Sequence, residues 1–148
     1  MSYKGRIGVG VITCERLPYL RGLLKSLEPC CDTIDELVVV NDGKPINNFK
    51  LEYGTWIQND TNQGVAKSKN KAMRHLFDKR CDYIFIIEDD MIIKDKSIFQ
   101  QYVNAYKARV FIILTMDLVL LLTASKLFKI RICIIVTCWM KARTQILN

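Results

Sequence analysis

Tyr83-Ile84-Phe85-Ile86-Ile87-Glu88-Asp89-Asp90 is the most informative segment of the chain, because five apolar residues are followed directly by three acids. A short, continuous apolar run is typical of a strand that is buried on both faces of a parallel sheet. In open α/β sheets the carboxyl ends of the strands face the ligand crevice, where neighbouring carboxylates repel one another unless a cation holds them. Sites built from oxygen ligands favour Mg²⁺ or Mn²⁺. The segment therefore predicts a divalent-metal site at the end of a central strand.

On both sides of this segment, short apolar runs alternate with helical spacing. Strands are expected over residues 7–12, 37–40, 56–58 and 83–87, and helices over residues 17–28, 64–77 and 97–106. Ser97 and Gln100 form a capping-box pattern at the start of the last helix. Gly8 and Gly10 allow another element to approach the first strand closely. The order β-α-β-β-α-β-α predicts an α/β fold with a mainly parallel sheet and helices on both faces.

Length, charge and cysteine content narrow the class of protein. The 148 residues fit a single domain, and the net charge of +7 is unevenly distributed, with +2 on residues 1–108 and +5 on residues 109–148. A nearly balanced first part is not typical of a surface that binds nucleic acid, so no nucleic-acid partner is expected. The six cysteines form no CxxC pair and the N-terminus has no secretory pattern. We therefore expect a reduced, cytoplasmic setting.

Four segments follow one another in the order seen in a known family. They are Val11-Ile12-Thr13-Cys14-Glu15-Arg16, Val38-Val39-Val40-Asn41-Asp42-Gly43, Asn62-Gln63-Gly64-Val65-Ala66-Lys67-Ser68-Lys69-Asn70 and Glu88-Asp89-Asp90. Together they resemble the nucleotide-sugar-binding half of a family 2 glycosyltransferase with the GT-A fold. The resemblance covers about residues 6–108. It implies a GT-A (Rossmann-like) sheet, a nucleotide-sugar donor of the UDP type, and a glycan or lipid-linked acceptor.

The same resemblance implies roles for the residues at the ends of the first two strands. Thr13, Glu15 and Arg16 would lie beside the nucleotide, and Asp42 would hydrogen-bond the base or the ribose. A carboxylate suits that role because it accepts charge-assisted hydrogen bonds from an imide N–H or a sugar hydroxyl. Judged by its own chemistry, however, Asn41-Asp42-Gly43 is typical of a plain turn, and that interpretation stays open.

The segment that begins at Asn62 corresponds to the glycine-containing loop and basic helix start of the family. The resemblance places Asn62, Gly64 and Lys67 near the diphosphate or the donor sugar. Gly64 can adopt a positive φ, backbone N–H groups at a helix start attract anions, and Lys67 adds a mobile positive charge. Lys69 and Lys71 are expected on a solvated face of the same helix.

Glu88-Asp89-Asp90 stands where the family has its DxD motif. The resemblance implies that Asp90 binds Mn²⁺ or Mg²⁺ directly, that Glu88 reaches the ion through a water, and that Asp89 contacts the donor. Such a metal would act as a Lewis acid on the departing nucleoside diphosphate. An exposed acidic loop after a core strand is the alternative interpretation.

Residues 109–148 form an apolar, basic tail that contains no Gly or Pro and a single acid, Asp117. The carboxylate base that an inverting transferase needs is not identified in this sequence. We therefore expect a nucleotide-sugar-binding domain over residues 1–108, an incomplete acceptor half, and a tail derived from a truncated or altered gene. Peripheral contact of the tail with the inner face of the membrane is the alternative.

Three functions follow from these observations and compete. The first is a metal-assisted glycosyltransferase that moves a sugar from a nucleotide-diphosphate donor to a glycan or lipid-linked acceptor. The second is a catalytically inactive remnant that still binds the nucleotide sugar. The third is a protein that interacts with membrane surfaces through the basic tail.

Overall fold

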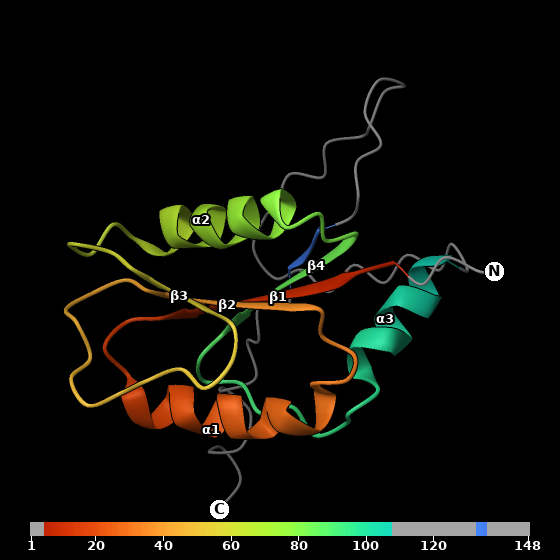
Figure 1. Cartoon of the computed structure of the whole chain (residues 1–148), viewed down its shortest axis with the longest axis horizontal. Helices are drawn as coiled ribbons and strands as arrows, with labels where there is room; N and C mark the ends of the chain where they lie inside the picture. The colour runs from red at the N-terminus through yellow and green to blue at the C-terminus, as the bar shows by residue number, and fades with distance from the viewer. Residues whose placement is uncertain (1–4, 108–132, 136–148) are drawn as a thin grey trace, which may run out of the picture.

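The computed structural model describes residues 5–107 and 133–135, which form an α/β fold (Figure 1). In chain order the elements are β1 (Ile7–Thr13), α1 (Leu17–Leu27), the 3₁₀ helix η1 (Glu28–Cys30), β2 (Glu36–Asn41), β3 (Thr55–Gln58), α2 (Val65–Asp78), β4 (Tyr83–Glu88), α3 (Ile98–Lys107) and β5 (Cys133–Ile135). The strands and helices predicted between residues 7 and 106 are all present. The short strand β5 was not predicted, and the rest of the tail, including Asp117, lies outside the described residues.

The described strands form one sheet in the order β3-β2-β1-β4-β5, and every neighbouring pair is parallel. The prediction of an α/β fold with a mainly parallel sheet is therefore confirmed. The chain steps outward from β1 through β2 to β3, and it then returns to the other side of β1 as β4. The carboxyl ends of β1 and β4 consequently flank the point where the strand order reverses. Open α/β sheets bind their ligands at such points.

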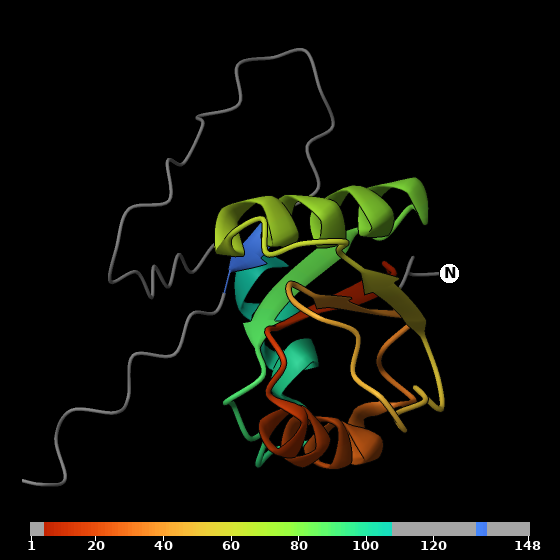
Figure 2. The ribbon, with the colours of Figure 1, turned by 90° about the vertical axis from the view of Figure 1, so that its left-hand side faces the viewer.

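Helices cover both faces of the sheet, as predicted (Figures 1 and 2). The core between the sheet and helices α1 and α3 includes Leu20, Leu23, Val39, Phe99 and Val103. The core between the sheet and α2 includes Val38, Val40, Ala72, Leu76 and Ile86. Val38 and Val39 belong to opposite cores because successive strand side chains point to opposite faces. Burial of each large aliphatic side chain contributes roughly 1.5–3 kcal/mol, so the two cores fix the sheet between the helices.

The glycines of β1 allow α2 to lie close to the sheet. A Cβ atom at Gly10 would stand 2.7 Å from Cδ1 of Ile86 and 3.0 Å from Cβ of Ala72. A Cβ atom at Gly8 would stand 2.9 Å from Cδ2 of Leu76, in α2, and 2.7 Å from Sγ of Cys81, which follows α2. These distances are shorter than ordinary van der Waals contacts between carbon or sulfur atoms. The expected close approach is thus confirmed, and α2 is the element that makes it.

The start of α3 differs from the predicted capping box. Oδ1 of Asp95 accepts hydrogen bonds from the backbone N–H of Ser97 (2.8 Å) and from its hydroxyl (2.7 Å), and Oδ2 accepts from Nε2 of Gln101 (2.8 Å). These bonds, that of the Ser97 hydroxyl above all, hold the pKa of Asp95 below its ordinary value. Gln100 donates instead to Asn104, one turn further on (2.9 Å). The predicted pairing of Ser97 with Gln100 is wrong because Asp95 already accepts the Ser97 N–H.

The α-helices of the described part of the chain, α1, α2 and α3, contain 11, 14 and 10 residues. Among residues 5–107 and 133–135, none combines the length and the apolar character that a membrane span requires.

Candidate functional site

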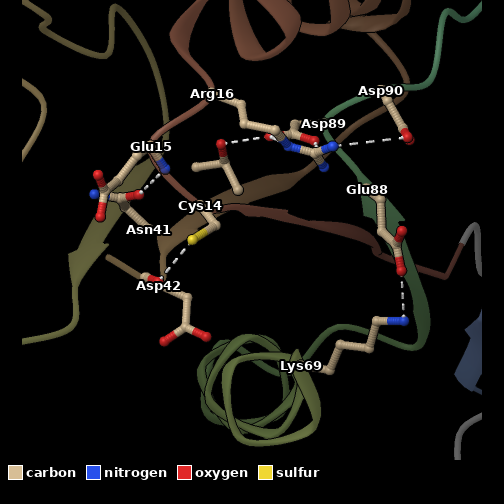
Figure 3. Close-up of polar contacts among 10 residues, drawn as sticks. Cys14, Glu15, Arg16, Asn41, Asp42, Lys69, Glu88, Asp89 and Asp90 are labelled. Carbon is tan, nitrogen blue, oxygen red and sulfur yellow. Dashed lines mark hydrogen bonds and ion pairs between the residues drawn. The ribbon is translucent and has the colours of Figure 1, made fainter. Parts of the chain in front are cut away.

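The candidate site lies at the carboxyl edge of the sheet, where β1 and β4 end side by side. Ile12 is the register partner of Glu88, so the residues that follow each strand are brought together. Figure 3 shows Arg16, from the connection between β1 and α1, reaching across to the acids that follow β4. Three of the predicted residues, Thr13, Arg16 and Asp89, are in direct contact here.

Asp89 is fully buried and its carboxylate is bonded within the chain. Oδ2 of Asp89 accepts a hydrogen bond from Oγ1 of Thr13 (2.6 Å) and another from Nε of Arg16 (3.2 Å). Oδ1 forms an ion pair with Nη2 of Arg16. Burial raises the pKa of Asp89, whereas Thr13 and Arg16 act in the opposite direction by stabilising the carboxylate. Asp89 therefore anchors the Thr13–Arg16 turn to β4, and its oxygens face protein donors.

The two acids on either side of Asp89 are more accessible. The side chains of Glu88 and Asp90 are 31% and 27% exposed, compared with 0% for Asp89. Oε1 of Glu88 lies 2.9 Å from Nζ of Lys69, and Oδ2 of Asp90 lies 4.0 Å from Nη1 of Arg16. Each carboxylate of the acidic cluster Glu88-Asp89-Asp90 thus has a basic partner within the chain (Figure 3).

The carboxylates of the acidic cluster determine how a metal ion could bind at this edge. Within residues 5–107 and 133–135, no three His, Cys, Asp or Glu side chains converge in a way that would hold one. Mg²⁺ and Mn²⁺ do not need such a cage, because they are commonly held by one or two carboxylates together with waters and substrate phosphates. Asp90 and Glu88 fit that arrangement as accessible carboxylates, whereas the buried Asp89 does not.

Asp42 is also buried, and it bonds to the loop that leads into α2. Its side chain points toward α2 in Figure 3, and Oδ1 accepts hydrogen bonds from Nδ2 of Asn59 and from the backbone N–H of Gln63, both at 2.7 Å. Burial by itself raises the pKa of Asp42. These two hydrogen bonds and others from Ser68 and Gly64 stabilise the carboxylate by more than burial disfavours it, so the pKa lies below its ordinary value. The described bonds of Asp42 therefore shape the loop over residues 59–64.

Asn41 was not predicted as a site residue, yet it links three segments of the edge. It is fully buried; Oδ1 accepts a hydrogen bond from the backbone N–H of Glu15 (3.2 Å), and Nδ2 donates to the carbonyl of Lys44 (2.8 Å) and to Oε1 of Gln58 (3.0 Å). Glu15 adopts a positive φ of 56° and accepts a bond from the Lys44 N–H (2.9 Å). A buried amide at the end of an apolar strand was the sequence signal, because such a group must find hydrogen-bond partners.

The residues predicted near the diphosphate lie at the start of α2. Gly64 has a φ of 88°, as expected, and its N–H donates to Oδ1 of Asn62 (3.0 Å). Nδ2 of Asn62 lies 3.6 Å from Sγ of Cys14, in the turn after β1. Lys67 is exposed. Asn62 therefore connects this loop to the β1 end of the edge, whereas Lys67 lies on the exposed surface of the helix.

Lys69 and Lys71 do not lie on a solvated face of α2, where they were expected. The side chain of Lys69 is only 15% exposed and pairs with Glu88. Nζ of Lys71 donates to Oδ1 of Asn59 (2.6 Å). Glu88 ends β4 and Asn59 follows β3, so both ammonium groups turn toward the carboxyl edge of the sheet. Residue spacing alone does not reveal this placement. The expectation for these two lysines is wrong.

A separate cavity of about 390 Å³ lies beside β3. Its walls come from β3 and from the connection between β2 and β3. The rings of Phe49 and Trp56 pack together there, with their centroids 5.3 Å apart. It is lined by Pro45, Ile46, Phe49, Lys50, Leu51, Gly54, Trp56 and Gln58. None of the residues predicted to bind donor or metal lines this cavity.

Comparisons of the chain with protein-family models, with curated proteins and with solved structures found no match. The functional interpretation therefore depends on the geometry of the edge and on the chemistry of its residues.

Proposed function

We propose that this chain is the donor-binding part of a metal-assisted glycosyltransferase of family 2 with the GT-A fold. It would bind a nucleotide sugar, UDP-linked in our proposal, at the carboxyl edge of the sheet. The sugar would pass to a hydroxyl of a glycan or lipid-linked acceptor. In that transfer the hydroxyl oxygen bonds to the anomeric carbon, the bond from this carbon to the diphosphate breaks, and the hydroxyl proton leaves to a base.

One observation carries this proposal: polar residues from three separate segments meet at the switch point of a parallel sheet. Thr13 ends β1 and Arg16 follows it, Asp89 and Asp90 follow β4, and Asn62, in the loop that leads into α2, lies 3.6 Å from Cys14 in the turn after β1. A switch-point edge of this kind is the usual ligand site of open α/β sheets. A helix start at the same edge favours an anionic group such as a diphosphate. The combination supports a nucleotide diphosphate better than it supports a neutral ligand.

The metal would be held by Asp90, with Glu88 in a supporting position. When bound, it supplies Lewis-acid stabilisation of the negative charge that develops on the leaving diphosphate. Arg16 cannot replace it at the phosphates without leaving the buried Asp89 unpaired, and breaking a buried charge pair is strongly unfavourable. In this proposal Arg16 positions the turn after β1, and Thr13 helps it to do so.

A second candidate is a protein that binds the nucleotide sugar without transferring it. Among residues 5–107, Asp95 is the only acid after Asp90, and its carboxylate is bonded to Ser97 and Gln101 at the start of α3. The described residues therefore offer no obvious base for the acceptor hydroxyl. A transfer assay with labelled donor separates the two candidates, because only the first predicts a labelled product.

The direct test is calorimetric titration of the full chain with UDP and the other nucleoside diphosphates, with and without Mn²⁺. We expect binding that is strengthened by Mn²⁺, and we expect Asp90→Ala to weaken the Mn²⁺-dependent binding by at least about tenfold, the usual scale for loss of a charged ligand contact. Asp32→Ala, which removes an exposed acid between η1 and β2, should leave binding unchanged. Absence of binding to every nucleotide, or the same affinity in Asp90→Ala, would exclude the proposed function.

A further inference from the structure

Lys69 pairs with Glu88, the acid that would support the proposed metal beside Asp90. Its Nζ lies 2.9 Å from Oε1 of Glu88; the Lys69 side chain is 15% exposed, and that of Glu88 is 31% exposed. Mg²⁺ sits about 2.0–2.1 Å from a carboxylate oxygen, or one water further away. An ion near Glu88 would therefore lie within a few ångströms of the Lys69 ammonium and would be repelled by it. Lys69 and the metal compete for the same carboxylate.

The two basic partners of the acidic cluster are not equally free to move. Arg16 bonds the fully buried Asp89 through two nitrogen atoms, and its departure would leave that carboxylate without a counter-charge. Lys69 bonds an acid that is partly exposed, through a single ammonium on a flexible four-carbon stem. Lys69 is therefore the partner that can leave.

A released Lys69 would stay at the carboxyl edge. It lies in the second turn of α2, and Figure 3 shows its side chain extending from the helix toward the end of β4. A diphosphate bound beside Asp90 would present anionic oxygens to the same region. The ammonium could then exchange one anionic partner for another with little movement of its backbone.

We infer that Lys69 is an internal counter-ion of the site, which leaves Glu88 when a divalent metal binds and then pairs with the diphosphate of the donor. This inference rests on the proposed function, because it needs a metal and a diphosphate at the same edge. Lys69 thus opposes binding of the metal alone and favours binding of the metal and diphosphate together. It acts as a positioning residue that couples the two ligands.

The test measures Mn²⁺ binding by electron paramagnetic resonance of the free ion, with no turnover involved. Full-length wild type and Lys69→Gln are titrated with Mn²⁺ alone and again in the presence of UDP. Without UDP, Lys69→Gln should bind Mn²⁺ roughly three- to tenfold more tightly, since a nearby positive charge has been removed. With UDP, the gain in Mn²⁺ affinity that the nucleotide produces should be smaller in Lys69→Gln than in wild type.

Lys79→Gln is the matched control, because it makes the same change at the C-cap of α2, roughly 15 Å away along the helix axis. It should bind Mn²⁺ like wild type. Lys69→Met provides a second variant of similar length, so a folding failure of one, detected by circular dichroism, leaves the other for the measurement. Equal or weaker Mn²⁺ binding by the Lys69 variants overturns the inference while leaving the proposed function intact. No Mn²⁺ binding by any protein, with or without UDP, overturns both.

Discussion

At the scale of single residues, the hydrogen bond between Thr13 and Asp89 is the clearest determinant of the edge. It joins two buried side chains over 2.6 Å, and it connects the end of β1 to the turn after β4. The carboxylate accepts from a neutral hydroxyl, and loss of that donor leaves the carboxylate less well solvated in a buried position. Such a loss usually costs about 1–3 kcal/mol.

Thr13→Val should therefore lower the free energy of unfolding by about 1–3 kcal/mol, because valine keeps the shape and removes the donor. Urea denaturation measures the change. Thr55→Val is the matched control, since the Thr55 hydroxyl lies 3.5 Å from Glu36 at a partly exposed position. We expect a change of less than about 0.5 kcal/mol there. An equal decrease in the free energy of unfolding in the two variants would show that the Thr13 hydrogen bond contributes no more than the partly exposed Thr55 contact.

Asp42 predicts a pH dependence of stability. Its pKa in the folded chain lies below the ordinary value of an aspartate, which is about 3.9. Between these two pKa values the unfolded chain binds the proton more readily than the folded chain does, so the contribution of Asp42 to stability is complete above about pH 4 and is lost as the pH falls further. Asp42→Asn cannot bind this proton.

The free energy of unfolding should consequently fall less steeply with acidification below about pH 4 in Asp42→Asn than in wild type. Urea denaturation at several pH values between about 2.5 and 5 measures both slopes. The variant should be less stable than wild type at neutral pH, where the charged acceptor is lost. Identical slopes would mean that the bonds to Asn59 and Gln63 do not favour the carboxylate.

At the scale of elements, the contact between β1 and α2 depends on the absence of a side chain. Gly10 leaves room for Ala72 and Ile86, whereas a Cβ at Gly22 on α1 would meet no atom closer than 3.6 Å. The two glycines therefore respond to the same substitution in opposite ways. At Gly10 the added methyl group overpacks a tight interface, and at Gly22 it improves a helix.

Gly10→Ala should destabilise the fold by about 1–3 kcal/mol. Gly22→Ala should stabilise it by up to about 1 kcal/mol, because alanine is the better helix former and has fewer unfolded conformations. Thermal or urea unfolding of the two variants gives the comparison. A stabilised Gly10→Ala would contradict the close packing of α2 on β1.

The elements were largely predictable because each carries a local signal. The apolar runs that become β1, β2 and β4 and the helical spacing of α1 and α2 are features of neighbouring residues, and burial of the resulting faces reinforces them. The strand β5 lacked such a signal: its three residues lie within a longer apolar and basic stretch, and pairing with β4 sets its bounds. The bonds of Asp95 at the start of α3 likewise depend on turn geometry.

At the scale of the whole molecule, the sequence predicted which strand ends would meet but not how the meeting residues would pair. Adjacency of Thr13 and Asp89 follows from placing β1 beside β4 in a parallel sheet. The pair of Lys69 with Glu88 depends in addition on the angle and depth at which α2 docks. That docking is set by Gly8, Gly10 and the core beneath the helix. The pairing of Lys69 with Glu88 therefore depends on how the helix packs on the sheet, which neighbouring residues in the sequence do not determine.

The parallel pairing of β1 with β4 also has a consequence for biosynthesis. β1 is made first, but the residues of β4 that pair with it lie 76 positions further along the chain, the same separation as that between Thr13 and Asp89. A nascent chain that has emerged from the ribosome only as far as β3 does not yet contain Glu88, Asp89 and Asp90 in its exposed part. In the proposed function, the ligand can therefore bind at this edge only after β4 has been made and has paired with β1.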